Sequence, residues 1–372
     1  MLVSNKCCIF AQNSKNMMNP FKFGVLVDNE FFTDRNNELK EVQLSLNSAN
    51  HLVLISPRRF GKSSLVAKAV KATGRPCISL NMQNMLSVED FASKILREIF
   101  RLYPMEKIRH LMTHFRIIPT VSTNPVTNVI DVSFQPVVNS MVLLEDALGL
   151  MEKVSTAEKK LIVVLDEFQE IMNIRKGLDK QLRSIMQEQE NLNYILLGSQ
   201  ESMMTEIFER KKAPFYHFGK MMRLDKIPYD DFWGYISSRL PLEDDAQKDL
   251  ITKEILSFTN LHPYYTQQLS AQVWEMLSYD KLVEDVVSEA ISKIVRTHDL
   301  DFERLWLNFN RTDRSVLLDI CKGINPMQNR LMASSTSYSA IKRLMKSGYV
   351  IRVNYYEIED PFFREWILRF CM

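Results

Sequence analysis

The chain has 372 residues, of which 46% are hydrophobic and 25% are charged, and its formal net charge is +2. These values are typical of a globular protein with enough length for two or three domains. They exclude a disordered chain, and no apolar run approaches the length of a membrane-spanning helix. Five cysteines without the spacing of a metal site favour reduced thiols and a cytoplasmic location.

Residues 1–19 are predicted to form a flexible leader. The first eighteen lack the long apolar run and the cleavage site of a secretory signal, so such a signal is not expected. Met17 or Met18 is a candidate for the true start of the protein. A predicted helix follows over residues 36–50, with an approximate apolar face.

The segment from Ser56 to Ser63 has the pattern of a triphosphate-binding loop. An apolar run over 51–55, predicted to be a strand, precedes it, and a predicted helix over 62–70 follows. In such a loop, backbone N–H groups wrap the phosphates and the helix N-terminus adds its positive end. Lys62 can then reach the β- and γ-phosphates of ATP, and the Ser63 hydroxyl can bind Mg²⁺.

The loop departs from the general motif at its first position, where Ser56 replaces the usual glycine. Pro57 favours an extended conformation for Ser56, which leaves Gly61 to supply the permissive turn. The alternative interpretation of the segment is an ordinary basic start of a helix. The residues expected to contact the nucleotide are Ser56, Pro57, Arg58, Arg59, Phe60, Gly61, Lys62, Ser63 and Ser64.

Three elements are predicted between this helix and residue 138. Residues 76–81 read as a second strand, and a capping-box-like pattern at Ser87 opens a helix that runs to about Leu102. Residues 115–138 contain three prolines among β-branched and polar residues. They predict a short β insertion with one hairpin at the edge of the sheet.

Two carboxylates follow the apolar run at 161–165, which predicts a buried strand of a parallel sheet. Open α/β sheets bind ligands at the carboxyl ends of their strands. Asp166 would hold Mg²⁺ through its waters, and Glu167 would take the proton of the attacking water in phosphoryl transfer. An acidic pair of this kind also occurs as a solvated loop start. A further buried strand is predicted over 193–198.

Three segments of the chain resemble the archaeal-type ATPase family. They are the loop Ser-Pro-Arg-Arg-Phe-Gly-Lys-Ser-Ser, the strand end Leu-Asp-Glu-Phe-Gln-Glu at 165–170 and the Phe-Thr-Asp-Arg segment at 32–35. This family is a branch of the AAA+/STAND P-loop ATPases and is similar in plan to the origin-initiator ATPases. Serine replaces the first loop glycine in that family, so Ser56 supports the resemblance. The likeness extends from about residue 21 to the end of the chain.

The resemblance implies several further site residues. Asn81 is placed like the AAA+ residue that restrains the catalytic glutamate, and a plain turn residue is the alternative. The strand at 193–198 corresponds to the sensor strand, whose terminal Ser199 or Gln200 would feel the γ-phosphate or the lytic water; such groups also cap helices. Phe32 and Arg35 are candidates for the adenine site, with core packing of Phe32 as the alternative.

The position at which relatives often carry an arginine finger reads Gly219-Lys220 here. Lysine lacks the planar fork that makes an arginine effective on a phosphate. Arg223 or Arg210 could replace it, or the chain has no finger, which would argue against fast hydrolysis stimulated by an oligomer.

A helical lid is predicted over 228–300, with helices at 229–240, 249–258 and 264–277. Relatives carry a Gly-x-Pro element in the lid, near the nucleotide. Leu261 stands at the glycine position here, while His262 and Pro263 match. His262 is therefore a candidate reporter of the nucleotide state, and Pro263 can equally be the first residue of a helix.

The C-terminal residues 301–372 are predicted to form a winged helix, because helices at 312–322 and 334–347 precede two strands about a turn at Asn354. Residues 302–372 carry eleven Lys and Arg against seven Asp and Glu, a net charge of +4. A winged helix can bind double-stranded DNA or dock a protein partner, and both alternatives stay open. The candidate DNA contacts are Ser337, Ser339, Lys342, Arg343 and Lys346.

These patterns together predict an α/β fold: a P-loop AAA+ parallel sheet flanked by helices over 20–227, a small helical lid over 228–300 and a C-terminal winged helix. We expect the protein to bind MgATP and to hydrolyse it slowly to ADP, switching the lid and the winged helix between arrangements. The alternative is a nucleotide-dependent protein-interaction scaffold with little or no hydrolysis. No membrane contact is expected, and the sequence leaves the oligomeric state open.

Overall fold

The computed structural model describes residues 18–27, 31–33, 35–48, 50–113, 115–117, 119–123, 130–133, 139–279, 285–328 and 332–372. Of the predicted leader at 1–19, residues 1–17 lie outside the described residues. The chain forms two compact units. The sheet unit comprises 36–58 and 65–224, and the helical unit comprises the described residues up to Arg35, residues 59–64 and residues 225–372.

The sheet unit is built on a parallel sheet, which confirms the predicted α/β class. Within the described residues its strands lie in the order β2-β5-β6-β1-β7, and every neighbouring pair is parallel. The strands are β1 (Leu52–Ile55), β2 (Cys77–Asn81), β5 (Leu161–Asp166), β6 (Leu192–Gly198) and β7 (Lys220–Arg223). Because all of them point the same way, their carboxyl ends meet at one edge of the sheet.

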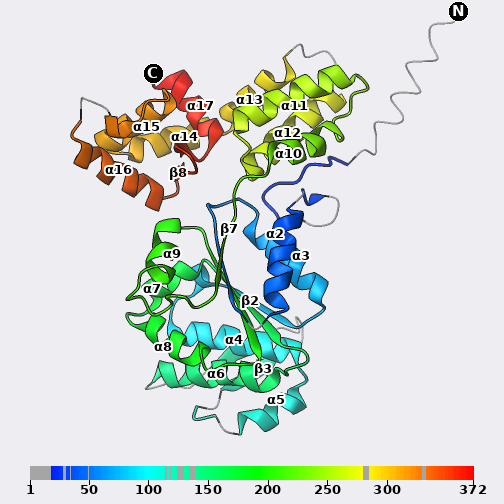
Figure 1. The fold of residues 1–372 in the computed structure, drawn as a ribbon, viewed down its shortest axis with the longest axis vertical. Helices are drawn as coiled ribbons and strands as arrows, with labels where there is room; N and C mark the ends of the chain where they lie inside the picture. Colours follow the sequence, from blue (N-terminus) through cyan, green and yellow to red (C-terminus); the bar gives the residue numbers. More distant parts are fainter. Residues whose placement is uncertain are drawn as a thin grey trace, which may run out of the picture. The chain divides into compact units, whose positions relative to one another are not determined.

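Helices cover both faces of this sheet, as Figure 1 shows for α2 (Asn36–Leu46), α3 (Lys62–Thr73), α4 (Val88–Leu102) and α6 (Ser140–Val154). Val53 and Ile55 of β1 belong to one apolar cluster with α4 and α6. Leu52 and Leu54 are equally buried but lie outside that cluster. Alternate side chains of a strand point to opposite faces, so both faces of β1 are covered.

The remaining helices of the sheet unit follow in chain order. They are α5 (Met105–Met112), α7 (Ile171–Ile174), α8 (Leu178–Met186) and α9 (Glu201–Phe208), with short 3₁₀ turns η3 (Met82–Asn84) and η4 (Phe168–Glu170). The helix predicted at Ser87 is present as α4, and the Ser87 hydroxyl accepts a hydrogen bond from the N–H of Asp90 at 3.2 Å.

The predicted hairpin is present, but its position differs from the prediction. Strands β3 (Thr120–Thr123) and β4 (Ile130–Ser133) pair antiparallel in a sheet of their own and do not extend the parallel sheet. The hairpin packs on α4, with Val132 buried and Arg97 paired to Asp131 at 3.1 Å. The flanking residues 124–129 and 134–138, which include part of the predicted β pattern, lie outside the described residues.

The helical unit has one continuous apolar core. Its helices are α10 (Tyr229–Ser237), α11 (Asp245–Thr259), α12 (Pro263–Tyr279), α13 (Val286–Thr297), α14 (Asp299–Asn308), α15 (Arg311–Cys321), α16 (Ser334–Lys346) and α17 (Pro361–Phe370), with the turn η5 (Pro326–Gln328). Strands β8 (Val350–Arg352) and β9 (Tyr356–Ile358) form an antiparallel hairpin between α16 and α17. The order of helices and hairpin is the one expected of a winged helix.

No helix among the described residues combines the length and the apolar character needed to cross a membrane.

Candidate functional site

The carboxyl edge of the parallel sheet gathers several of the predicted site residues. Asn81 and Asp166 lie side by side at the ends of β2 and β5. Ile55 of β1 pairs with Gly198 of β6, and the N–H of Ser56 donates to the Gly198 carbonyl at 3.2 Å. Ser56 and Ser199 therefore begin the loops that leave neighbouring strands at this edge.

Glu167 directly follows β5 and is held by two donors. One carboxylate oxygen, Oε2, accepts from the Ser199 hydroxyl at 2.5 Å and from the Gln169 side-chain amide at 2.5 Å. The residue has a φ of 52°, in the left-handed region, and its N–H donates to Asp166 Oδ1 at 2.9 Å. The hydrogen bonds thus fix one oxygen of the carboxylate and orient the other.

Gln169 is a functional candidate that the sequence did not single out. Its side chain is fully buried, although glutamine is usually exposed. The only local signal is its place two residues after Glu167, within η4. A buried amide at this spacing can bond back to the carboxylate, but a sequence pattern alone does not say that it does.

Asn81 and Gln200 occupy different roles. The Asn81 side chain accepts from the N–H of Gln83 at 2.9 Å and so caps η3, which is the turn role left open as the alternative. Gln200 precedes α9; among the residues that the structure describes, its side chain caps no N–H group and its buried Oε1 has no hydrogen-bond partner.

The candidate phosphate loop, Ser56 to Ser64, leaves β1 and enters α3 at Lys62. In the sheet unit, Ser56 is fully buried and its hydroxyl donates to the Pro57 carbonyl at 3.1 Å; Arg58 is exposed. In the helical unit, Gly61 has a φ of 88°, which confirms that it supplies the left-handed turn. Lys62 is only 6% exposed.

The N-terminal segment holds the part of the loop that belongs to the helical unit. Arg35 Nη2 donates to the Phe60 carbonyl at 3.2 Å, and the N–H of Val27 donates to the Ser64 hydroxyl at 3.1 Å. Phe60 itself is buried. Arg35 therefore contacts the backbone of the loop, and its own φ of 73° shows that the surrounding contacts fix its conformation.

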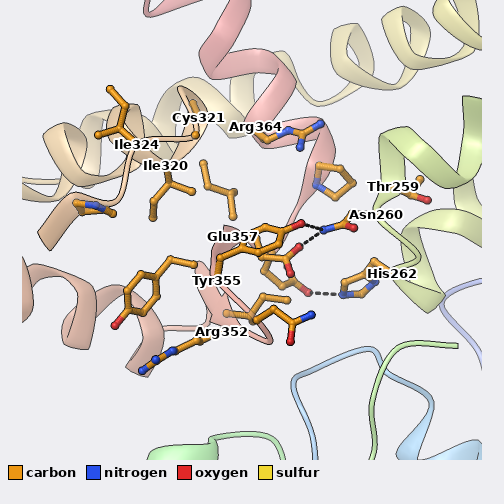
Figure 2. A pocket seen from close by; sticks show the side chains of 18 of the residues that line it. Thr259, Asn260, His262, Ile320, Cys321, Ile324, Arg352, Tyr355, Glu357 and Arg364 are labelled. Carbon is orange, nitrogen blue, oxygen red and sulfur yellow. Dashed lines mark hydrogen bonds and ion pairs between the residues drawn. The ribbon is translucent and has the colours of Figure 1, made fainter. Parts of the chain in front are cut away.

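His262 lies beside the loop, edge-on to the Phe60 ring with 4.9 Å between ring centres. It is 2% exposed, and burial lowers its pKa, with Glu359 acting in the opposite direction. Its Nε2 is 3.4 Å from Glu359 Oε1, the contact drawn as a dashed line in Figure 2. Pro263 is the first residue of α12, as the structural alternative expected.

The two residues at 260–261, just before His262 and α12, have the left-handed backbone that a glycine would adopt without strain. Asn260 and Leu261 both have positive φ, 49° and 59°. A leucine in this region costs free energy, so the surrounding contacts must hold it. The Asn260 side-chain amide, for example, donates to Glu357 of β9 (Figure 2).

A cavity of about 600 Å³ lies in the helical unit next to these residues. Figure 2 shows its lining side chains, which come from the end of α11, the end of α15, the β8–β9 hairpin and the start of α17. His262, Glu357 and Glu359 are part of the wall. Glu357 is already engaged by Lys226 at 2.8 Å.

Each of the three candidates for a phosphate-stabilising cation is engaged in an ion pair on the sheet unit. Lys220 contacts Glu41 at 2.8 Å, Arg223 contacts Glu209 at 2.7 Å, and Arg210 contacts Glu206 at 2.5 Å.

The candidate DNA contacts on α16 divide into two groups. Ser337 is fully buried, so it faces the core and cannot reach a nucleic acid in this arrangement; that part of the prediction is corrected. Arg343 pairs with Asp313 of α15 at 2.6 Å, which gives it a structural role. Lys342, Lys346 and Ser339 are exposed.

The two residues predicted to bind the metal carry oxygen donors, which suit magnesium better than a transition metal. Across the described residues, no group of three or more His, Cys, Asp or Glu side chains could hold a metal ion. Mg²⁺ takes few protein ligands, prefers oxygen donors and keeps several waters. The Ser63 hydroxyl and the Asp166 carboxylate are donors of this kind.

Known proteins resemble the chain in sequence pattern and in fold. A family profile described as an ATPase domain predominantly from Archaea matches residues 32–269, while no curated protein matches. Among solved structures, the Walker-type ATPase PABY2304 of Pyrococcus abyssi is 16% identical with a TM-score of 0.62, covering 91% of this chain and 97% of its own. The ORC2 protein of Aeropyrum pernix, in ADPNP–ADP complexes, is 15% identical with a TM-score of 0.53, covering 94% and 98%.

The structural likeness establishes the same fold, and the profile covers more than half of the chain, including the candidate phosphate loop, the acidic pair and the Ser199 strand. The chain therefore belongs to the family of ATPase domains found predominantly in Archaea.

Proposed function

We propose that the protein binds MgATP, hydrolyses it slowly to ADP and phosphate, and uses the two nucleotide states to switch the arrangement of its lid and C-terminal region. The observation that carries the proposal is the carboxyl edge of the sheet, where Asp166, Glu167 and Ser199 lie next to the start of the phosphate loop. No other set of described residues combines a phosphate-binding pattern with an oriented carboxylate.

Each residue has a distinct part in this reaction. The backbone N–H groups of the phosphate loop and the Lys62 ammonium bind the phosphates, while Ser63 and Asp166 would hold Mg²⁺, which neutralises charge on the β- and γ-phosphates when bound. Glu167 takes a proton from the attacking water while the oxygen of that water forms a bond to the γ-phosphorus. The bond from that phosphorus to the bridging oxygen breaks, and ADP leaves with the electron pair.

The expectation of slow turnover rests on the cations. An arginine finger accelerates phosphoryl transfer by about 10³ to 10⁵. Arg210 and Arg223 are both paired with glutamates of their own chain, and Lys220 lacks the fork that binds a phosphate with two hydrogen bonds. With no such group committed to the phosphates, the reaction depends on Glu167 and the phosphate loop.

The experiment that tests the proposal is release of phosphate from ATP by the purified protein, with Mg²⁺ and with the metal chelated by EDTA. We expect a slow release that requires Mg²⁺ and yields ADP in equal amount. ATP binding without any release above the chelated control would instead favour the scaffold alternative. Absence of both binding and release would refute the proposal.

Duplex DNA binding is a second candidate function, favoured by the exposed Lys342 and Lys346 on α16. We expect the Lys342→Ala, Lys346→Ala double variant to bind a labelled duplex more weakly. Its plot of log affinity against log salt should be shallower by about two, because each phosphate contact contributes about one to that slope. Fluorescence anisotropy at several salt concentrations measures both.

The matched control is Lys211→Ala, Lys212→Ala, which removes two exposed lysines from the sheet unit. Equal weakening by both double variants would show a non-specific charge effect and contradict α16 as the contact. If the wild type binds no duplex at all, the DNA-binding candidate is refuted.

A further inference from the structure

Two residues of the phosphate loop have left-handed backbones, Arg59 at a φ of 61° and Gly61 at 88°. Alternation of right- and left-handed residues turns successive N–H groups into one concavity, the anion-binding arrangement called a nest. Glycine adopts the left-handed conformation freely, but in any other residue this conformation costs free energy. The loop therefore keeps its shape only if something holds Arg59.

The Arg59 side chain is held by two tyrosines of α12. Its Nη1 donates to the Tyr265 hydroxyl at 2.6 Å, and the guanidinium lies over the Tyr264 ring, 4.7 Å from its centre. A cation on an aromatic face and a charge-assisted hydrogen bond are both favourable. Together they oppose rotation of the Arg59 backbone back to a negative φ.

Tyr265 is itself held by Glu359, which directly follows the β8–β9 hairpin. Its hydroxyl donates to Glu359 Oε2 at 2.7 Å, and its ring is buried. The N–H of Glu359 donates to the Tyr349 carbonyl at 3.0 Å, which anchors Glu359 to the start of the hairpin. A chain of hydrogen bonds thus runs from the hairpin through α12 to the loop.

The electrostatics of this cluster agree with the geometry. Burial lowers the pKa of Arg59, but Tyr265 and the carboxylates of Glu359 and Asp360 outweigh that effect and raise it. Burial and the neighbouring Glu359 raise the pKa of Asp360 to about 6. The positive charge of Arg59 is thus compensated on the side of the hairpin.

We propose that Tyr265 and Glu359 are positioning residues of the nucleotide site, which hold Arg59 in the left-handed conformation so that the loop is shaped to receive phosphates. The proposal rests on the nucleotide site proposed above. Under this proposal the C-terminal region controls nucleotide affinity. When Glu359 moves away from Tyr265, Arg59 is no longer held in the left-handed conformation and the affinity of the loop for nucleotide falls.

The test compares glycine with alanine at position 59, because only glycine adopts a positive φ without cost. MgADP binding is measured by calorimetry on the full-length protein. We expect Arg59→Ala to bind roughly five- to thirty-fold more weakly than Arg59→Gly, which is the cost of a left-handed non-glycine residue. Equal affinity of the two variants would overturn the proposal, because it would mean that Arg59 acts through its charge alone.

The second arm tests the tyrosine. Tyr265→Phe keeps the ring and removes the hydroxyl that joins Arg59 to Glu359. It should weaken MgADP binding in the wild-type background and have no effect in the Arg59→Gly background, where nothing needs to be held. A loss of the same size in both backgrounds would overturn the proposal.

The third arm uses two glutamates of the helical unit. Glu359→Gln removes the negative charge that strengthens the hydrogen bond from Tyr265 and compensates Arg59, so it should weaken MgADP binding. Glu365→Gln, which removes the charge paired with Arg369 on α17, should leave the affinity within about two-fold, as expected of a residue outside the chain of hydrogen bonds. The reverse ranking would contradict the role of Glu359. If the wild type binds no MgADP, it is the proposed nucleotide site that fails, so the two failures are distinguishable.

Discussion

Replacing Glu167 with glutamine is expected to lower ATP turnover by about 100-fold or more, the usual contribution of a positioned general base. The amide cannot accept the proton of the attacking water. Its oxygen can still accept the hydrogen bonds from Ser199 and Gln169 that fix the present carboxylate, so the local structure should persist. ATP affinity should therefore remain within about two- to three-fold of wild type, because this interaction is made only in the transition state.

The matched control is Glu170→Gln, three residues further along at the end of η4, where the carboxylate accepts from the Asn173 side chain at 2.7 Å. This variant removes a nearby charge without touching the oriented carboxylate and should keep wild-type turnover. Phosphate release and equilibrium ATP binding are measured on both variants. Turnover of Glu167→Gln equal to that of wild type would exclude Glu167 as the base.

Phe168→Ala is expected to have the largest effect on stability, lowering the free energy of unfolding by about 3–5 kcal/mol, the usual cost of removing a buried phenyl ring. Phe168 is fully buried between the rings of Phe208 and Phe215, with centre distances of 5.6 and 5.2 Å. The ring also anchors η4, which carries Gln169. Loss of the ring should therefore disturb the support of Glu167 as well.

Urea unfolding followed by circular dichroism measures this effect. Leu86→Ala is the control, because Leu86 is 89% exposed in the same unit and its loss should change stability by less than about 0.5 kcal/mol. A cost for Phe168→Ala no larger than that of the control would contradict the packing described for η4.

The parallel sheet could be predicted because β1, β5 and β6 are short runs of mostly buried residues, most of them apolar, and β2 alternates buried Ile78 and Leu80 with polar residues. β7 could not. Its residues Lys220 to Arg223 have charged ends and no β-branched side chain, and the segment pairs with β1 through a hydrogen bond from Lys220 N–H to the His51 carbonyl. Its strand conformation comes from a partner about 170 residues earlier in the sequence, which no local pattern contains.

The candidate site shows the same division between local motifs, which can be predicted, and tertiary contacts, which cannot. The phosphate loop and the acidic pair are local motifs and were visible in the sequence. The amide partner of Glu167 could not be predicted from the sequence, because Asn81 and Gln169 both have amide side chains of suitable chemistry. The tertiary structure decides that Asn81 caps η3 while Gln169 donates to the carboxylate. The contact between Arg59 and Tyr265, 206 positions apart, has no sequence signal at all.

Leu261 illustrates how a departure from a motif can be structurally silent. The resemblance to the ATPase family implies a glycine there, and the structure has a left-handed backbone at this position with a leucine. The side chain changes while the turn into α12 keeps its shape. His262 consequently remains beside Phe60 of the phosphate loop.

Whether Lys62 and Asp166 serve one bound nucleotide is best decided by measuring ATP affinity with Mg²⁺ and with EDTA for wild type, Lys62→Ala and Asp166→Asn. We expect Lys62→Ala to lose about 30-fold or more in both conditions, because it removes a charged partner of the phosphates. Asp166→Asn should match wild type in EDTA but gain nothing from Mg²⁺. An Asp166→Asn variant that keeps the full Mg²⁺ effect, or a Lys62→Ala variant that binds like wild type, would contradict a shared site.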